Sequence, residues 1–551
     1  MADNNNYETW TKPSLIQKLK RLESELKRHS IALPVPVKEQ GPAPTVEAVG
    51  EDGKPKKPKG KRKMDPSKYS TRYIALKLAY LGKNFGGFEH QISSNQPSIE
   101  EELYIALTRA CLIFPNDEKI VDWESCEYSK CGRTDRGVSA FGQVIGIRVR
   151  SNKPVPKKRI RLEEGQAADQ LESPEGEQEF EEEKPFDHIH DEIAYPRVLN
   201  RLLPPEIRVL AWCPSPPPDF SARFSCRERQ YRYFFTQPAF SPEPSSIGGD
   251  EIKPGWLDIE AMRDAAKRFE GEHDFRNVCK IDPAKMITNF KRTMFESDIV
   301  EVKDVNSALP YLQSQGFAPE GFQPQDGVVY PKVYYFHVRG SAFLWHQIRH
   351  MVALLFLVGQ RLEAPSVISD ILDVEKTPGR PNYVMADEVP LVLWDCIFPD
   401  LSSGEQVPID NRYKDTMQWV YVGDEGAAQG KSGQFGQWGA TDGLWQTWRE
   451  RKIDELLANQ LLQEVSSKLV LNLPPPAEAA NKGNAPTSAR VFEGANTGRS
   501  AGKYVPIMKK DRLQPPDEQN DKYAKRKGYA DAQDMRDKKF GGNKGDQAGD
   551  E

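Results

Sequence analysis

The amino-acid sequence predicts an α+β fold, in which strands and helices are mixed without strict alternation. Residues 74–79 alternate large apolar side chains with alanine and lysine, which is typical of a strand. Residues 98–112 have helical periodicity, with acidic residues in the first turn where the helix dipole favours them. Predicted strands also follow one another in β-turn-β pairs, which favours an α+β arrangement over a doubly wound parallel sheet.

Further elements are predicted along the chain by the same periodicities. Residues 144–149 alternate after a glycine-rich turn and predict another strand. After about residue 400 the pattern weakens, although several tryptophans and a helix-like segment at 448–469 indicate that part of this region packs. The other expected strands are 208–212, 230–235 and 332–338, and the other expected helices are 257–269, 342–359 and 365–372.

Composition excludes several classes of protein. The 551 residues carry 76 basic and 81 acidic side chains, so the net charge of −5 indicates no particular partner. The mean hydropathy of −0.67 predicts that part of the chain is disordered. The longest apolar run, Met351–Val358, is far too short to span a bilayer. The N-terminus has no signal-peptide pattern, and seven cysteines without a framework suggest a reducing compartment. We expect a soluble intracellular protein that does not enter a membrane.

Shifts in composition divide the chain into five parts. The segment Lys54–Lys63 holds seven basic residues in ten, which predicts a nuclear import signal, an RNA-phosphate arm or only a solvated linker. The predicted parts are an N-terminal helix at 1–32, a basic disordered linker at 33–69, a folded core at 70–400 with an acidic insertion at 163–187, a partly ordered extension at 401–472 and a disordered tail at 473–551.

The most unusual segment is Cys131–Val144 (CGRTDRGVSAFGQV). Asp135 lies between Arg133 and Arg136, and a glycine on either side of this group allows a tight turn and close approach of a ligand. Two nearby guanidinium groups would lower the pKa of the Asp135 carboxyl, or they could bind phosphate in bidentate fashion. The alternative is a structural turn in which the aspartate caps the neighbouring backbone.

A second segment, Phe220–Phe235, combines arginines with aromatic residues. Tyr231, Tyr233 and Phe235 share one face of a predicted strand, and Arg232 lies on the other face. Aromatic rings beside arginines suit stacking on unpaired bases next to a phosphate backbone. A half-buried strand would have a similar pattern.

A third segment, Gly340–Val352, opens a helix that is apolar almost all round and is therefore expected to be buried. The guanidinium of Arg349 then needs an anionic partner, and Asp135 is available. His346 and His350 have the i, i+4 spacing of a metal pair, but without an HExxH pattern a polar helix edge is the stronger interpretation.

No metal or cofactor is expected from the remaining motifs. Cys126 and Cys131 have no second cysteine pair, so a zinc site between them is not predicted. The sequence contains neither a GxxxxGK[ST] loop nor a GxGxxG turn after a strand, which argues against an energy-coupled or dinucleotide enzyme.

Taken together, these segments resemble the TruA-type tRNA pseudouridine synthases. The resemblance begins at Leu78–Phe88, continues through GRTDRGVSAFGQV, ARFSCRERQYRY and FLWHQIRHM, and ends at Pro390–Cys396. It covers roughly residues 70–400. It implies two similar halves, 70–215 and 216–400, that form a central antiparallel sheet flanked by helices, with the catalytic cleft between the halves. It also implies a homodimer.

A narrower resemblance is to the eukaryotic branch that modifies uridines 38 and 39 of the tRNA anticodon stem-loop. It rests on Gly271–Asp282, Ser341–Gln347 and the variant Ser139. Two positions depart from common relatives. Arg136 stands where lysine or alanine is usual, and Ser139 replaces a histidine, so no role of that histidine carries over.

The resemblance also implies roles for individual residues. Asp135 would be the catalytic aspartate, Tyr231 would stack on the target base and move the C5 proton, and Arg349 would pair with Asp135. Because the target base must leave its helix stack before it reacts, a separate hypothesis is that Arg133 and Arg136 fill the gap left by the flipped base or hold adjacent phosphates. We expect tRNA as substrate, no cofactor, and a location in nucleus and cytoplasm. The alternatives are another tRNA or RNA position and a catalytically silent RNA-binding relative.

Overall fold

The computed structural model describes a large part of the chain, and the described residues all belong to one unit, 64–551. The predicted N-terminal helix, the Lys54–Lys63 segment and nearly all of the acidic insertion lie outside the described residues. The described residues are 64–92, 94–117, 120–155, 185–243, 252–302, 331–399, 412–424, 439–467, 489–494 and 499–540.

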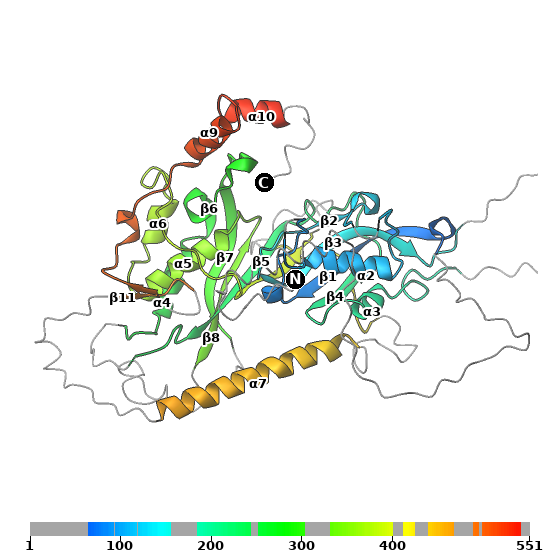
Figure 1. Ribbon diagram of the computed structural model, residues 1–551, viewed down its shortest axis with the longest axis horizontal. Coiled ribbons are helices and arrows are strands. Elements are labelled where there is room, and N and C mark those ends of the chain that lie inside the picture. The colour runs from blue at the N-terminus through cyan, green and yellow to red at the C-terminus, as the bar shows by residue number, and fades with distance from the viewer. Residues whose placement is uncertain are drawn as a thin grey trace, which may run out of the picture. The chain divides into compact units, whose positions relative to one another are not determined.

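A ten-stranded sheet forms the centre of the structure (Figure 1). The first half of the sheet contains β10 (Val420–Tyr421), β4 (Ile207–Cys213), β1 (Ser70–Tyr80) and β3 (Ser139–Ser151) in that order, with β2 (Ser129–Lys130) also beside β3. The second half continues with β9 (Leu391–Ile397), β5 (Glu228–Gln237), β8 (Lys332–Gly340), β7 (Lys291–Glu301) and β6 (Gly271–Asp274).

The two halves meet where β3 lies beside β9. This pairing is parallel and joins Ser139 to Val392 and Ala140 to Leu393, whereas the other strand pairs described in this sheet are antiparallel. The short contact at the centre therefore joins two antiparallel half-sheets. The predicted α+β fold with a central, mostly antiparallel sheet is confirmed.

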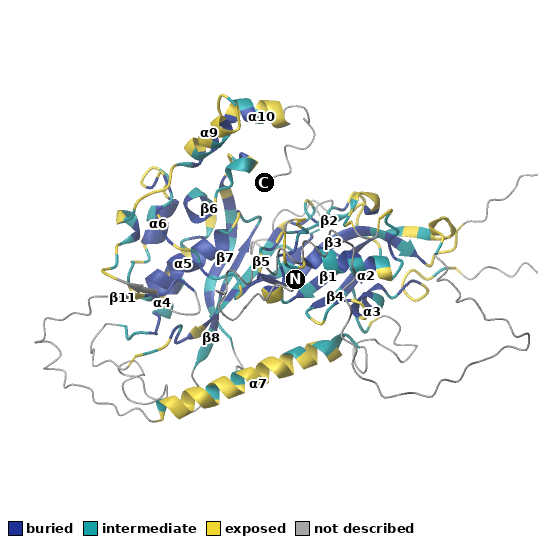
Figure 2. Ribbon diagram, in the orientation of Figure 1, coloured by how far each residue is buried: buried dark blue, intermediate teal, exposed yellow. Residues whose placement is uncertain are grey.

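Each half of the sheet has its own hydrophobic core. The first core includes apolar residues of β1, β3 and β4 together with α2 (Ile99–Arg109) and α3 (Tyr195–Asn200). The second includes residues of β5, β7 and β8 together with α4 (Ile259–Lys267), α5 (Gln347–Gly359) and α6 (Val367–Leu372). The predicted helix at 342–359 is buried along its whole helical length, as the dark blue of α5 in Figure 2 shows. Tyr231 packs against both cores, so it marks the junction of the halves.

The structure shortens the predicted helix at 342–359, which begins only at Gln347. The residue before it, His346, has a left-handed backbone with φ of 59°. Because that conformation cannot continue a right-handed helix, the preceding residues are free to form an irregular segment beside the junction.

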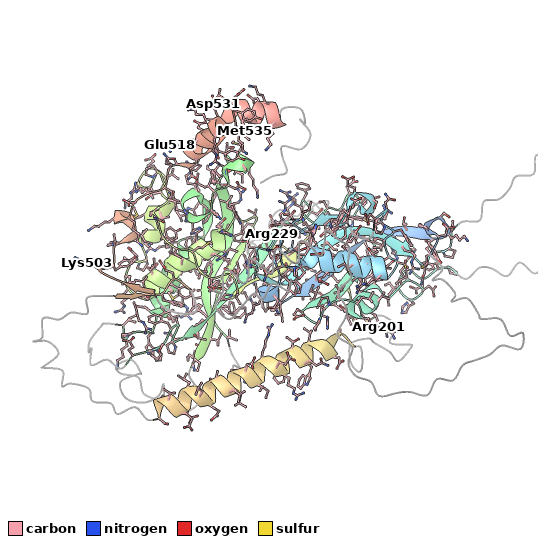
Figure 3. All side chains as sticks on the ribbon, in the orientation of Figure 1. Arg201, Arg229, Lys503, Glu518, Asp531 and Met535 are labelled. Atoms are coloured by element: carbon pink, nitrogen blue, oxygen red, sulfur yellow. The ribbon has the colours of Figure 1, made fainter. Side chains whose placement is uncertain are left out.

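The predicted disordered tail at 473–551 is wrong for its described residues, 489–494 and 499–540. Val491, Phe492 and Ile507 are buried in the second core, and α9 (Pro516–Arg526) is followed by α10 (Ala532–Phe540). Met535 of α10, labelled in Figure 3, packs with Met286 in a small apolar cluster. The composition of this region is polar because only a few apolar residues contact the core, and composition averaged over a long segment hides them. Two short strands, β11 (Ala489–Val491) and β12 (Arg499–Ala501), also pair here.

The described residues of the extension after residue 400 include one strand and one long helix. Its strand β10 pairs with β4 at the edge of the main sheet. Its helix α7 (Ala440–Ser466) begins eight residues before the predicted segment and is mostly exposed, yellow in Figure 2. In the described part of the chain, no helix has the length and apolar character needed to cross a membrane.

Candidate active site

The segment that carries Asp135 is a loop between β2 and β3, held at several points. The backbone of Gly132 exchanges two hydrogen bonds with the Gln143 side chain, at 3.2 and 2.7 Å. The Thr134 hydroxyl lies 2.7 Å from the Tyr80 hydroxyl. The backbone carbonyl of Thr134 accepts a hydrogen bond from the backbone amide of Phe88 at 3.1 Å. The position of the Asp135 carboxylate is therefore set by the first half of the sheet.

Two glycines allow this loop to pack tightly. A Cβ added to Gly87 would lie 3.0 Å from the Thr134 carbonyl oxygen. Gly137, with φ of 82°, has the left-handed conformation that glycine adopts without strain, and a Cβ there would lie 2.6 Å from Cγ of Glu388. The tight turn predicted at this glycine is therefore present, and the absence of a side chain at Gly137 leaves room for Glu388 of the second half.

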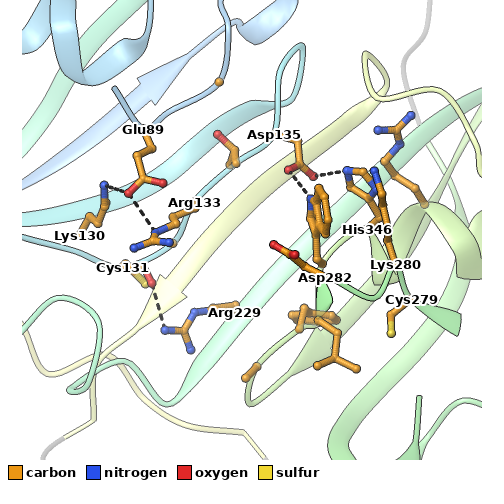
Figure 4. A pocket seen from close by; sticks show the side chains of 18 of the residues that line it. Glu89, Lys130, Cys131, Arg133, Asp135, Arg229, Cys279, Lys280, Asp282 and His346 are labelled. Carbon is orange, nitrogen blue, oxygen red and sulfur yellow. Dashed lines mark hydrogen bonds and ion pairs between the residues drawn. The ribbon is translucent and has the colours of Figure 1, made fainter. Parts of the chain in front are cut away.

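The second half supplies the groups that contact Asp135 (Figure 4). Nε1 of Trp345 donates to Oδ1 at 3.2 Å, and Nε2 of His346 lies 3.4 Å from Oδ2. Burial, with Arg349 and Lys280 nearby, lowers the pKa of His346 to about 4. The imidazole is thus neutral at neutral pH and acts as a polar neighbour of the carboxylate, not as an ionic partner.

The pKa of Asp135 is raised, which corrects the predicted lowering. Burial is the main cause, and the negative charge of Glu388 adds to it. The Trp345 hydrogen bond, Arg349 and Lys280 act in the opposite direction. Arg133 and Arg136 do not determine this pKa because both side chains are exposed, and Arg133 pairs with Glu89 at 3.2 Å.

Arg349 does not form the predicted ion pair with Asp135. Its Nε donates to the Ala386 carbonyl at 2.7 Å, and NH2 binds Glu388 at 2.7 Å. The expectation of a buried guanidinium with an anionic partner holds, but the partner is a carboxylate on the loop before β9. Arg349 still favours the ionised form of Asp135 through its charge.

Tyr231 lies on β5, where strand alternation sets its direction. Tyr233 and Phe235 are buried in the second core, and Arg232 lies on the opposite face as predicted, 3.6 Å from the Trp394 ring centre. The Tyr231 ring packs edge-on against Phe343, with centroids 5.1 Å apart. Burial strongly raises the pKa of Tyr231, so its phenol is neutral at neutral pH.

Asp135, Tyr231, Arg349, Arg133 and Arg136 all line one cavity of about 1290 Å³. This exceeds the range of about 300–1,000 Å³ usual for small-molecule pockets. Ten lysines and arginines line it against four aspartates and glutamates. A large cavity in which basic residues outnumber acidic ones, with the partly exposed carboxylate of Asp135 in its lining, suits a polyanion that inserts one unit into the site.

The two histidines of the third segment do not form a metal pair. His346 faces Asp135 from the left-handed position before α5. His350 is buried in α5, and its ring nitrogens lie 3.2 and 3.3 Å from NH1 of Arg380. The predicted polar helix edge is wrong, because His346 precedes α5 and His350 is buried within it.

Three cavity residues were not predicted as site residues from the sequence. Trp345 occurs in the FLWHQIRHM motif, four positions before Arg349. This proximity to a predicted site residue could have identified it as a candidate. Lys280 lies within the Gly271–Asp282 motif, and its Nζ lies 4.3 Å from the Trp345 ring centre. Glu388 had no local signal, because only the fold brings it to Arg349.

Comparison with known proteins agrees with this geometry. The family described as tRNA pseudouridine synthase matches residues 265–399. A tRNA pseudouridine(38/39) synthase of Saccharomyces cerevisiae is 37% identical over 411 residues, which are 74% of this chain and 75% of the yeast protein. The proteins of that name from Bos taurus and Homo sapiens are 40% and 39% identical. The matched regions cover 64% and 62% of this chain but only 60% and 59% of those two relatives.

The matched family region includes α5 and β9, and the longer matches extend over most of the sheet-forming chain. The yeast protein is 37% identical and is covered over three-quarters of its length, which shows the family of this chain. The chain belongs to the tRNA pseudouridine synthase family.

Proposed function

We propose that this protein converts uridine to pseudouridine in tRNA at positions 38 and 39 of the anticodon stem-loop, with Asp135 as the catalytic residue. One observation carries the proposal: a partly exposed carboxylate at the junction of the two halves, in a basic cavity that also contains Tyr231. The names of the relatives support the tRNA substrate and the two positions.

The reaction is an isomerisation that the side chains of the cavity can support. The N1–C1′ bond breaks, the uracil turns over, C5 bonds to C1′, and the C5 proton is lost as a proton returns to N1. The ionised carboxylate of Asp135 assists as a nucleophile or as a base. An enclosed cavity retains the detached uracil. The balance of atoms requires no redox partner and no energy source, so we expect the chemical step to need no cofactor.

Tyr231 has two tasks in this proposal. Its ring stacks on the target base, and its hydroxyl takes part in moving the C5 proton. Because burial keeps the phenol protonated, it can accept that proton only while passing its own to another acceptor. We infer that the acceptor is Asp135, whose carboxylate lines the same cavity.

The substrate must present its uridine outside the helical stack, because the reacting bonds are inaccessible within it. Arg133 and Arg136 are exposed on the loop of Asp135. We infer that they hold the phosphates beside the target nucleotide or fill the gap that it leaves. The same proposal includes a homodimer and a location in nucleus and cytoplasm, the latter on the basic segment Lys54–Lys63.

Pseudouridine mapping on an anticodon stem-loop tRNA tests the proposal. The intact protein should modify positions 38 or 39 without added metal or nucleotide, and Asp135→Ala should not, while still binding the tRNA. Asp264→Asn is the matched control, because Asp264 lies on α4 and its only described ion pair is with Arg268. Product at other positions would refute the position, and tight binding without product would favour the RNA-binding alternative.

A further inference from the structure

Three cysteines from distant parts of the chain meet beside the cavity. Their sulfur atoms, in Cys131, Cys226 and Cys396, all lie within 4.8 Å of one another. The three residues are only 3%, 5% and 0% exposed. Cys131 begins the loop of Asp135, Cys226 precedes β5, and Cys396 lies on β9.

We propose that these three cysteines bind one zinc ion through their thiolates. Zinc bonds sulfur at about 2.3 Å in tetrahedral geometry, which places neighbouring ligand sulfurs about 3.8 Å apart. Because the three sulfur atoms already lie within 4.8 Å of one another, small side-chain rotations would complete the geometry. Cys131 and Cys226 also line the cavity. The fourth position therefore faces the cavity, where a water molecule can occupy it.

A nearby positive charge supports an anionic cluster at this place. Arg229 lies directly opposite Cys396 in the β5–β9 pairing, so the two side chains project from the same face of the sheet. The guanidinium donates to the backbone carbonyls of Cys131 and Arg223 at 3.1 Å and of Ser341 at 2.9 Å, and Figure 4 shows the first of these contacts.

Arg229 is notable because, among the described residues, no carboxylate forms an ion pair with it. Arg229 is partly buried at the cavity wall, and a guanidinium withdrawn from water is costly without a compensating negative charge. Three thiolates and a divalent cation carry a net charge of −1, which one guanidinium neutralises. The charge of Arg229 thus matches a zinc–thiolate centre, whereas three neutral thiols would leave it uncompensated.

The location suggests what the ion would do. Cys131 is four residues before Asp135, and Cys226 is five residues before Tyr231. Cys396 lies on β9, the strand that joins the two halves. A zinc ion here would tie the loop of Asp135 to the strands of the second half. The three cysteines would then be positioning residues, and the chemical step itself would not involve the metal.

Sequence reasoning could not find this cluster. It compared Cys131 with its neighbour Cys126, whereas the fold pairs Cys131 with two cysteines 95 and 265 positions further along the chain. Two of the three ligands come from single cysteines without a CxxC pattern, so spacing carries no signal.

Elemental analysis of the full-length protein, purified without chelators, tests the proposal. We expect about one zinc per chain. Cys131→Ser, Cys226→Ser and Cys396→Ser should each lower the zinc content at least about tenfold, because each removes a first ligand of the ion. Cys213→Ser is the matched control, since Cys213 is equally buried on β4 but outside the cluster, and its zinc content should remain unchanged.

Cobalt replacement gives a second measurement that does not depend on folding of the variants. Cobalt added to the metal-free protein should produce sulfur-to-cobalt charge-transfer absorption, and zinc should abolish it. Substoichiometric zinc in the intact protein with no cobalt absorption would overturn the proposal, as would a disulfide between two of the three cysteines. Because neither measurement uses tRNA, a failure here is distinct from a failure of the proposed enzymatic function.

Discussion

The two halves of the sheet contribute different things to the cavity. The first half holds the loop of Asp135, through Tyr80, Phe88 and Gln143. The second half supplies the groups that contact or surround the carboxylate, among them Trp345, His346 and Tyr231. Each half also has a separate hydrophobic core. Because the cores are separate, we expect that substitutions of cavity residues at the junction can change activity without unfolding either half. The following predictions test that separation.

The largest effect is expected at Tyr231, where the two cores meet. Tyr231→Phe keeps the ring but removes the hydroxyl, and it should lower the single-turnover rate at least about 100-fold because proton transfer typically contributes that much. Tyr231→Leu should lose a further ~1–3 kcal/mol of stacking on the base. Tyr335→Phe is the control, because Tyr335 lies under Arg232 on the other face. An unchanged rate in Tyr231→Phe would show that the hydroxyl has no part in the reaction.

A smaller effect is expected at Trp345, through which the second half holds the carboxylate of the first. Trp345→Phe removes the Nε1 donor to Asp135. The single-turnover rate should fall roughly 10- to 100-fold, because a hydrogen bond to a charged group contributes about 1.5–3 kcal/mol. Trp394→Phe, on the opposite face beside Arg232, should leave the rate unchanged. Equal losses in both variants would indicate a general effect of tryptophan removal.

The dependence of the rate on pH should report the opposing influences on Asp135. The carboxylate must be ionised to act, and burial raises its pKa. As the pH is lowered, activity should therefore be lost at a higher pH than it would be with an ordinary aspartate. Glu388→Gln removes a charge that raises this pKa, and the acidic limb should move to lower pH. Trp345→Phe removes a hydrogen bond that lowers the pKa, and the limb should move to higher pH. If the acidic limb moved in the same direction in both variants, it would not report the ionisation of Asp135.

The smallest effect is expected at the cavity rim. Arg133→Ala should weaken tRNA binding roughly fivefold, which corresponds to about 1 kcal/mol, and reduce the slope of log affinity against log salt by about one. The single-turnover rate at saturating tRNA should change little. Glu89→Gln removes the ion-pair partner of Arg133 and should not weaken binding. Unchanged affinity together with an unchanged rate in Arg133→Ala would refute its role.

Local patterns predicted much of the fold because they report how single elements are buried. The strands at 208–212, 230–235 and 332–338 correspond to β4, β5 and β8. The alternation around Tyr231 correctly separated the core face from the face of Arg232. The prediction of a disordered tail was wrong where residues such as Phe492 and Ile507 are buried, because they pack against a core formed by residues far away in the sequence.

The sequence by itself determined the family, the strand pattern, and the candidates Asp135, Tyr231 and Arg349, because short motifs and periodicities carry that information. Only the tertiary structure decided which side chains contact one another in and beside the cavity. Arg349 pairs with Glu388, Asp135 contacts Trp345, and Cys131 lies beside two remote cysteines. Charges and ligands act over a few ångströms in space, and these residues, which are between 39 and 265 positions apart in the sequence, reach that distance only in the folded chain.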